Sequence, residues 1–155
     1  MELKTKIDAK DGQQDLWITR EFDLPLPLLF KAFTEPEIVE QWMGTKVIKL
    51  ESEKHGSYQI ETSDAKGNLA FRANGVIHEL VPEQKIIRTF EMENTPFGVQ
   101  LEIYEFEHVT GDTCKLNMHV IYESITQRDQ VLKLPFAQGI NMAHNRIQEI
   151  LTALK

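Results

Sequence analysis

The chain has 155 residues, enough for one domain that buries roughly 68–70% of the surface of its unfolded form. Its formal net charge of −7 and its lack of clustered lysines and arginines exclude a typical nucleic-acid partner. Nothing approaches the ~20 apolar residues of a membrane span, and residues 1–15 lack the apolar run of a signal peptide. With a single cysteine, Cys114, the sequence favours a cytoplasmic protein that has no disulfide and no membrane contact.

Residues 1–13 are polar and are expected to be a frayed lead-in to a single domain over residues 14–155. The β-branched and aromatic residues of QDLWITREF, at 14–22, predict a first strand. A short helix should then begin near Pro27, with Asp23 as a candidate cap. The next segment, TEPEIVEQWMG, predicts a second helix that has Thr34 as its N-cap and ends at Gly44.

Six segments between residues 45 and 123 alternate apolar and polar residues, with turn residues between them. They span residues 45–51, 56–62, 69–80, 85–93, 99–109 and 113–123. This pattern predicts an antiparallel meander with one buried face. In the fifth segment the apolar parity changes between Ile103 and Tyr104, which predicts either a bulge or a strand buried on both faces.

The end of the chain predicts a short helix carrying Val131 and Leu132, a break at Pro135 and then a long amphipathic helix. The stripe of that helix consists of Phe136, Ile140, Ala143, Ile147, Leu151 and Leu154. An apolar stripe must be buried, and the available partner is the apolar face of the sheet. We therefore expect an α+β fold in which a curved antiparallel sheet wraps around the C-terminal helix.

Several segments occur in an order and spacing typical of one family: ITREF, FTEPE, QW, HGSYQI, GVIHELVPEQKIIRTF and RDQVLKLPFAQGINMAHNRIQEIL. Together they resemble the activator of heat-shock-protein-90 ATPase homologue family, part of the SRPBCC (START-like, birch-pollen-allergen-like) superfamily. The resemblance implies a helix-grip fold with a cavity between the curved sheet and the final helix. Two segments, LPF and MAHN, depart from the pattern of many members, so no ligand identity can be transferred.

The resemblance places Trp42 at the mouth of this cavity, where its ring could cover a ligand or simply fill the core. Methionines and aromatic residues suit an adaptable apolar pocket, although they also describe a filled core. The candidate ligand-binding residues are Trp42, Met43, Tyr58, Arg88, Phe90, Met118, Tyr122, Phe136, Ile140 and His144.

Arg88 shares its strand parity with Ile86 and Phe90, which points its guanidinium toward the inner face of the sheet. A buried guanidinium requires a partner, either the carboxylate of a ligand or a carboxylate of the protein. We expect a protein carboxylate, and we expect the same for Arg20 in the first strand.

The sequence contains no motif for catalysis, metal binding or cofactor binding. The five histidines lack metal-ligand spacing, and no nucleophile elbow or phosphate-binding loop occurs. Cys114 lies on an apolar strand face, as an inert buried thiol would, and no acidic residue stands out as belonging to an apolar face. We therefore expect no metal and no cofactor.

These observations favour a domain that binds a hydrophobic or amphipathic small molecule and performs no chemistry. One alternative is an enzyme of the cyclase, dehydratase or hydrolase type that uses His78, His144 or Arg88 in the same cavity. Another, implied by the family resemblance, is an interaction module that contacts a chaperone. The resemblance also leaves room for a homodimer.

Overall fold

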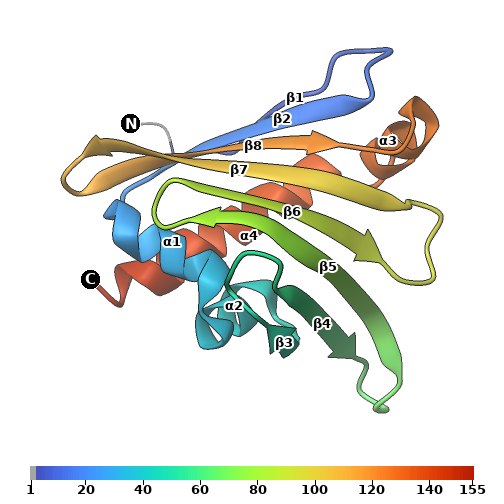
Figure 1. Cartoon of the computed structure of the whole chain (residues 1–155), viewed down its shortest axis with the longest axis horizontal. Helices are drawn as coiled ribbons and strands as arrows, with labels where there is room; N and C mark the ends of the chain where they lie inside the picture. The colour runs from blue at the N-terminus through green and yellow to red at the C-terminus, as the bar shows by residue number, and fades with distance from the viewer. Residues whose placement is uncertain (1–2) are drawn as a thin grey trace.

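Eight strands form one antiparallel sheet in the computed structural model, which describes residues 3–155 (Figure 1). They are β1 (Lys6–Asp8), β2 (Asp15–Phe22), β3 (Lys46–Leu50), β4 (Ser57–Ser63), β5 (Leu69–Val81), β6 (Lys85–Met92), β7 (Val99–Thr110) and β8 (Thr113–Ile121). Their spatial order is β1-β2-β8-β7-β6-β5-β4-β3. The strands from β3 to β8 therefore form the expected meander, and β1 and β3 are the edges of the sheet.

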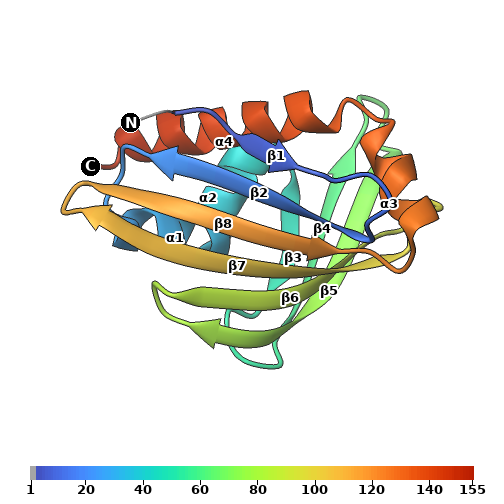
Figure 2. The same ribbon diagram turned by 90° about the horizontal axis from the view of Figure 1, so that it is seen from above.

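Four helices accompany the sheet in the described part of the chain: α1 (Leu26–Thr34), α2 (Pro36–Met43), α3 (Ile125–Leu132) and α4 (Phe136–Thr152). The helices α1, α2 and α4 lie on the same side of the sheet, and α3 lies at one end of it (Figures 1 and 2). On α4, Ile147 and Leu151 of the expected stripe are fully buried, whereas Leu154 lies beyond the helix and is exposed. The predicted α+β helix-grip architecture is confirmed.

The core lies between the inner face of the sheet and these helices. The alternation of β8 is regular, with Cys114, Leu116, Met118 and Val120 buried. Antiparallel pairing places each of these residues opposite an inward-facing residue of β2, such as Leu116 opposite Arg20. The period-two pattern of the sequence is thus the direct cause of the single buried face.

Part of the polar lead-in is structured, contrary to expectation. Residues 6–8 form β1, which pairs antiparallel with β2, and Thr5 is buried. The backbone N–H of Thr5 donates to Asn141 Oδ1 of α4 at 3.0 Å. This strand has only a weak sequence signal, because it is three residues long and lies at the edge of the sheet. Residues 1–2 of the expected lead-in lie outside the described residues.

The expected helix caps are only partly correct. The N-cap of α2 is Glu35, not Thr34, and the hydroxyl of Thr34 instead donates to the carbonyl of Phe30 at 3.2 Å. The N-cap position of α1 is Pro25, not Asp23. Gly44 ends α2 as expected, with a φ of 64° that glycine adopts without a steric penalty.

The predicted bulge in β7 is wrong, because β7 pairs with β8 in one continuous register from Leu101 to His108. Along this stretch Glu102, Tyr104 and Phe106 are buried, while Ile103 on the opposite face is half-buried. The strand is thus partly covered on both faces, which was the second expectation. The apolar parity changes because a charged residue, Glu102, occupies an inward-facing position.

Candidate functional site

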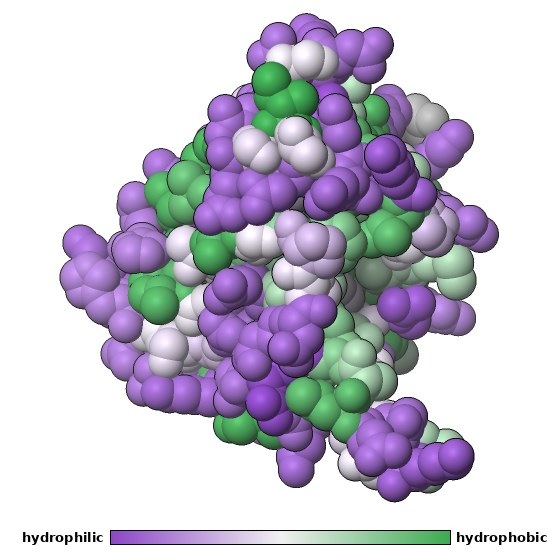
Figure 3. All heavy atoms as spheres, turned by 90° about the vertical axis from the view of Figure 1, so that its right-hand side faces the viewer, coloured by the Kyte–Doolittle hydropathy of each residue, from purple (hydrophilic) through white to green (hydrophobic). Residues whose placement is uncertain are grey.

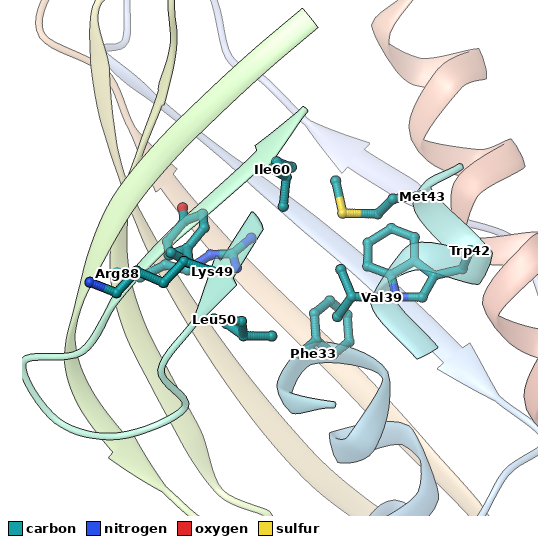
Figure 4. Close-up of a pocket in the computed structure, with 9 residues that line it drawn as sticks. Phe33, Val39, Trp42, Met43, Lys49, Leu50, Ile60 and Arg88 are labelled. Atoms are coloured by element: carbon teal, nitrogen blue, oxygen red, sulfur yellow. The ribbon is translucent and has the colours of Figure 1, made fainter. Parts of the chain in front are cut away.

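A small pocket lies between the helices α1 and α2 and the strands β3, β4 and β6. Its lining consists of Phe33, Val39, Trp42, Met43, Lys49, Leu50, Tyr58, Ile60 and Arg88. In Figure 4, Trp42, Val39 and Met43 lie on one side of the pocket and Arg88 and Lys49 on the other. The free volume is about 20 Å³, which holds about one water molecule.

Trp42 of α2 is held in place by contacts with two other helices, α1 and α4. Its indole N–H donates to the carbonyl of Ala32 on α1 at 2.6 Å, and its ring packs edge-to-face against Phe33 with centroids 5.6 Å apart. Its own carbonyl accepts from Arg146 Nε of α4 at 2.7 Å. From the sequence, Trp42 could either fill the core or line the cavity. In the structure it does both, because its ring is buried and it also lines the pocket.

Arg88 belongs to a closed network of hydrogen bonds on the inner face of the sheet. It lies directly opposite Glu102 in the β6–β7 ladder, and its Nε donates to Glu102 Oε1 at 2.8 Å. Its Nη2 donates to the hydroxyl of Tyr104 at 2.8 Å, and that hydroxyl donates to the same Glu102 oxygen at 2.9 Å. The other oxygen of Glu102 accepts from the amide of Gln100 at 2.8 Å. The expectation that a protein carboxylate pairs with Arg88 is confirmed.

Two tyrosine rings complete the surroundings of Arg88. Its guanidinium carbon lies 4.7 Å from the ring centroid of Tyr58 and 5.0 Å from that of Tyr104. Burial opposes the charge of Arg88, but Tyr104, Tyr58 and Glu102 outweigh it and raise the pKa of Arg88 well above its ordinary value. Burial also raises the pKa of Tyr58 and the pKa of Tyr104. At neutral pH the network therefore contains a charged guanidinium between protonated phenols.

Tyr58 crosses beneath β5 to reach β6, where its hydroxyl donates to the carbonyl of Thr89. This crossing depends on Gly75, because a Cβ there would lie 2.7 Å from the Tyr58 hydroxyl oxygen and 2.0 Å from the Thr89 carbonyl oxygen. The glycine thus leaves room for the ring that supports Arg88.

The structure brings four of the ten candidate ligand-binding residues together at this pocket: Trp42, Met43, Tyr58 and Arg88. The other six are placed elsewhere in the core or against it: Phe90, Met118, Tyr122, Phe136, Ile140 and His144. The pocket lies under α2, and no residue of α4 is part of its lining as described. Ligand contact by the six residues outside this lining stays a prediction.

His144 belongs to a second buried polar network, beside Arg20. The hydroxyl of Thr5 lies 2.8 Å from His144 Nδ1. Burial, with a further contribution from the charge of Arg20, lowers the pKa of His144 to about 3. The imidazole is therefore neutral at physiological pH. It connects α4 to Phe22 of β2 and to Thr5, the residue before β1.

Arg20 is 2% exposed and donates to neutral oxygens. Its Nη1 lies 2.9 Å from Asn145 Oδ1 and 3.4 Å from both Thr5 Oγ1 and Asn141 Oδ1, and its Nε donates to the carbonyl of Glu21 at 3.2 Å. The side-chain carboxylate that we expected is not among these acceptors in the described residues. Burial lowers the pKa of Arg20, in contrast to Arg88.

Cys114, the lone cysteine, lies in an environment that does not activate a thiol. Cys114 is fully buried, and burial raises the pKa of its thiol to about 12, as an inert cysteine requires. Among residues 3–155, no group of three or more histidine, cysteine, aspartate or glutamate side chains could hold a metal ion.

Sequence reasoning missed five residues of the pocket lining, Phe33, Val39, Leu50, Ile60 and Lys49, and also Glu102 behind it. The first four looked like ordinary core residues, and only the packing of α1 and α2 on β3 and β4 brings them to one pocket. The inward orientation of Glu102 could have been predicted, because Glu102 shares its strand parity with the inward-facing Tyr104 and Phe106.

Comparison with known proteins places the chain in a family. Residues 23–152 match the family described as activator of Hsp90 ATPase homolog 1-like protein, and because this match covers most of the chain, the chain belongs to that family. The predicted family is therefore confirmed. No curated protein matches the chain.

Solved structures of bacterial proteins share the fold over nearly the whole chain. A Rhodobacter sphaeroides protein is 22% identical with a TM-score of 0.85, covering 97% of this chain and 99% of its own. A Mycobacterium smegmatis protein is 21% identical with a TM-score of 0.81, covering 97% and 98%. A Nitrosomonas europaea protein is 21% identical with a TM-score of 0.77, covering 95% and 99%. At these identities the likeness establishes the fold alone.

No helix of the described residues combines the length and the apolar character that crossing a bilayer demands.

Proposed function

We propose that this protein binds a small hydrophobic or amphipathic molecule in the pocket under α2. The observation that carries the proposal is the composition of the pocket, in which apolar side chains from four elements converge on one buried guanidinium. Binding sites for small molecules typically combine an apolar lining with a few fixed polar groups that orient the ligand. The network around Arg88 supplies such a group, held rigidly by Glu102 and Tyr104.

Binding requires the pocket to grow, because about 20 Å³ is too small for any organic ligand. The elements that could move are α2 and β3. As an edge strand, β3 pairs with β4 alone, and the register of that pairing shifts between Val47 and Lys49. The carboxylate of Glu40 on α2 accepts from the backbone N–H of Val47 at 2.8 Å. This bond joins α2 to β3, so the two elements would shift together as the pocket opens.

The lining favours binding over catalysis. Its nine residues include no histidine, cysteine, serine, aspartate or glutamate. Of the two that could exchange a proton, Lys49 pairs with Glu51 and the hydroxyl of Tyr58 donates to the carbonyl of Thr89. Neither His78 nor His144, the histidines considered for an enzyme, is among the lining residues.

An interaction module would need a broad apolar surface. The end of the molecule that carries α3 and the β4–β5 turn is mostly hydrophilic, with its apolar residues in separate small groups (Figure 3). That face therefore gives the chaperone alternative no support.

The proposal is tested by thermal denaturation of the wild-type protein with a panel of alcohols, amides, fatty acids and aromatic compounds. A ligand that binds only the folded state at 100 times its dissociation constant stabilises it by about 2.7 kcal/mol, which raises the melting temperature. The variant Leu50→Trp should fill the pocket and abolish the shift. The matched control Ile48→Trp, at a position of the same strand that is 43% exposed, should retain it. The absence of a shift with every compound would contradict the proposal.

A further inference from the structure

Resting on the proposed function, we infer that the pocket selects neutral ligands with a polar head group, and that Glu102 sets this selectivity. The polar end of the pocket is a guanidinium that already has a counter-ion. Arg88 and Glu102 together carry no net charge, and their contact is 2.8 Å with side chains only 16% and 7% exposed. A ligand therefore meets a neutral ion pair and not a free cation.

Arg88 nevertheless keeps donors for a ligand. A guanidinium has five N–H groups, and within the described residues Arg88 uses one on Glu102 and one on Tyr104. The guanidinium forms part of the pocket lining, whereas Glu102 is not among the lining residues. A hydroxyl, amide or carbonyl oxygen entering the pocket could thus accept from Arg88 without displacing Glu102.

A carboxylate ligand would face a different situation. Its charge would come close to Arg88 but also close to the fixed carboxylate of Glu102, in a site with little solvent to screen the repulsion. Glu102 cannot turn away at low cost, because Tyr104 and Gln100 also donate to it. Like charges brought together in this way disfavour the wrong partner strongly. An ammonium ligand would be disfavoured in the same way by Arg88.

Lys49 is the other charged residue of the lining, and it could attract an anion. Its side chain is 53% exposed, and its ammonium lies 3.5 Å from the carboxylate of Glu51. Water and this partner screen its field, so its effect on a ligand head group is weak. The buried pair of Arg88 and Glu102 decides the selectivity.

The test compares three probes of equal chain length, octanol, octanoate and octylammonium, binding to the wild-type protein at neutral pH by calorimetric titration. We expect octanol to bind and both ions to bind at least about tenfold more weakly. In Glu102→Gln, which keeps an acceptor oxygen for Arg88, octanoate should gain at least about tenfold while octylammonium gains nothing. The control Glu105→Gln removes the same charge from an exposed position of the same strand and should behave as wild type.

The outcomes separate the two proposals. Wild-type protein that binds octanoate as well as octanol overturns the role of Glu102 but leaves the binding function intact. Unchanged selectivity in Glu102→Gln also overturns the role of Glu102. So does tighter binding of all three probes by this variant, because that result would indicate a loosened pocket that admits every probe. Wild-type protein that binds no probe overturns the proposed function and the selectivity with it.

Discussion

Two arginines on the inner face of the sheet, the buried Arg20 and the largely covered Arg88, are held in opposite ways. Arg88 pairs with a carboxylate, stacks near two tyrosine rings and lines a pocket. Arg20 is surrounded by the amides of Asn141 and Asn145 and by Thr5, where α4 closes on β1 and β2. The sequence raised the same question at both positions, and the structure answers it differently.

The difference separates a site that holds the elements of the fold together from a site that lines a pocket. At Arg20, the side-chain acceptors come from α4 and from Thr5 before β1, so the guanidinium fastens α4 and the start of the chain to β2. At Arg88, the acceptors come from β7 alone, and the helices cover the guanidinium only with apolar side chains. The first site is therefore structural, whereas the second presents a polar group to a small cavity.

Replacing Arg88 should have the largest effect on stability. Arg88→Met leaves the carboxylate of Glu102 buried without its counter-ion, and such a loss typically costs about 3–5 kcal/mol. Urea denaturation measures it as a lower midpoint at an unchanged slope. The double variant Arg88→Met with Glu102→Leu should recover most of the loss. A loss no larger than that of Arg20→Met would remove the distinction between the two arginines.

Replacing Arg20 should cost less. Arg20→Met leaves Asn145 Oδ1 without its donor and removes the longer contacts to Asn141 and Thr5, but it leaves no buried charge, so we expect a loss of about 1–3 kcal/mol. The same denaturation experiment measures it. Ligand binding at the pocket should persist in this variant, and its disappearance would show that the two sites are coupled.

The network of Arg20 also predicts a dependence on pH. The pKa of His144 is about 3 in the folded protein and near 6.5 when unfolded, so the unfolded state binds more protons between these values. Stability should thus fall as pH falls below 6.5, with this residue contributing about 1.4 kcal/mol between pH 7.5 and 5.5. His144→Gln should lose that part of the dependence. An unchanged dependence would mean that His144 is accessible to protons in the folded state.

A third arginine provides a baseline with the smallest effect. Arg72 pairs with Glu61 at 2.9 Å, but its side chain is 35% exposed. Arg72→Met should therefore cost no more than about 1 kcal/mol in the same denaturation experiment. A larger loss would show that a half-exposed ion pair on this sheet contributes as much as the networks of its inner face.

Most of the fold could be predicted because its signals are local. The alternation of β8 and the stripe of α4 each specify a buried face, and Gly44 ends α2 through its own backbone preference. The caps at Thr34 and Asp23 failed because Pro25 and Pro36 set where the helices begin.

The site was harder to predict because its lining comes from five separate elements. Arg88 and Trp42 were identified from strand parity and helix position, but Leu50 and Ile60 reach the pocket only through the register between β3 and β4. Glu102 was overlooked because the change of parity in β7 was interpreted as either a bulge or a strand buried on both faces. The change also marks a charged residue at an inward-facing position.

The central claim is that a small molecule binds under α2, beside Arg88. The most direct measurement is an NMR titration of the methyl groups of the wild-type protein with octanol. We predict that the signals of Met43, Leu50 and Ile60 move in a saturable way, while that of Ile140 on α4 stays in place. Saturable changes centred on Ile140, or no change at any of these methyl groups, would contradict the account.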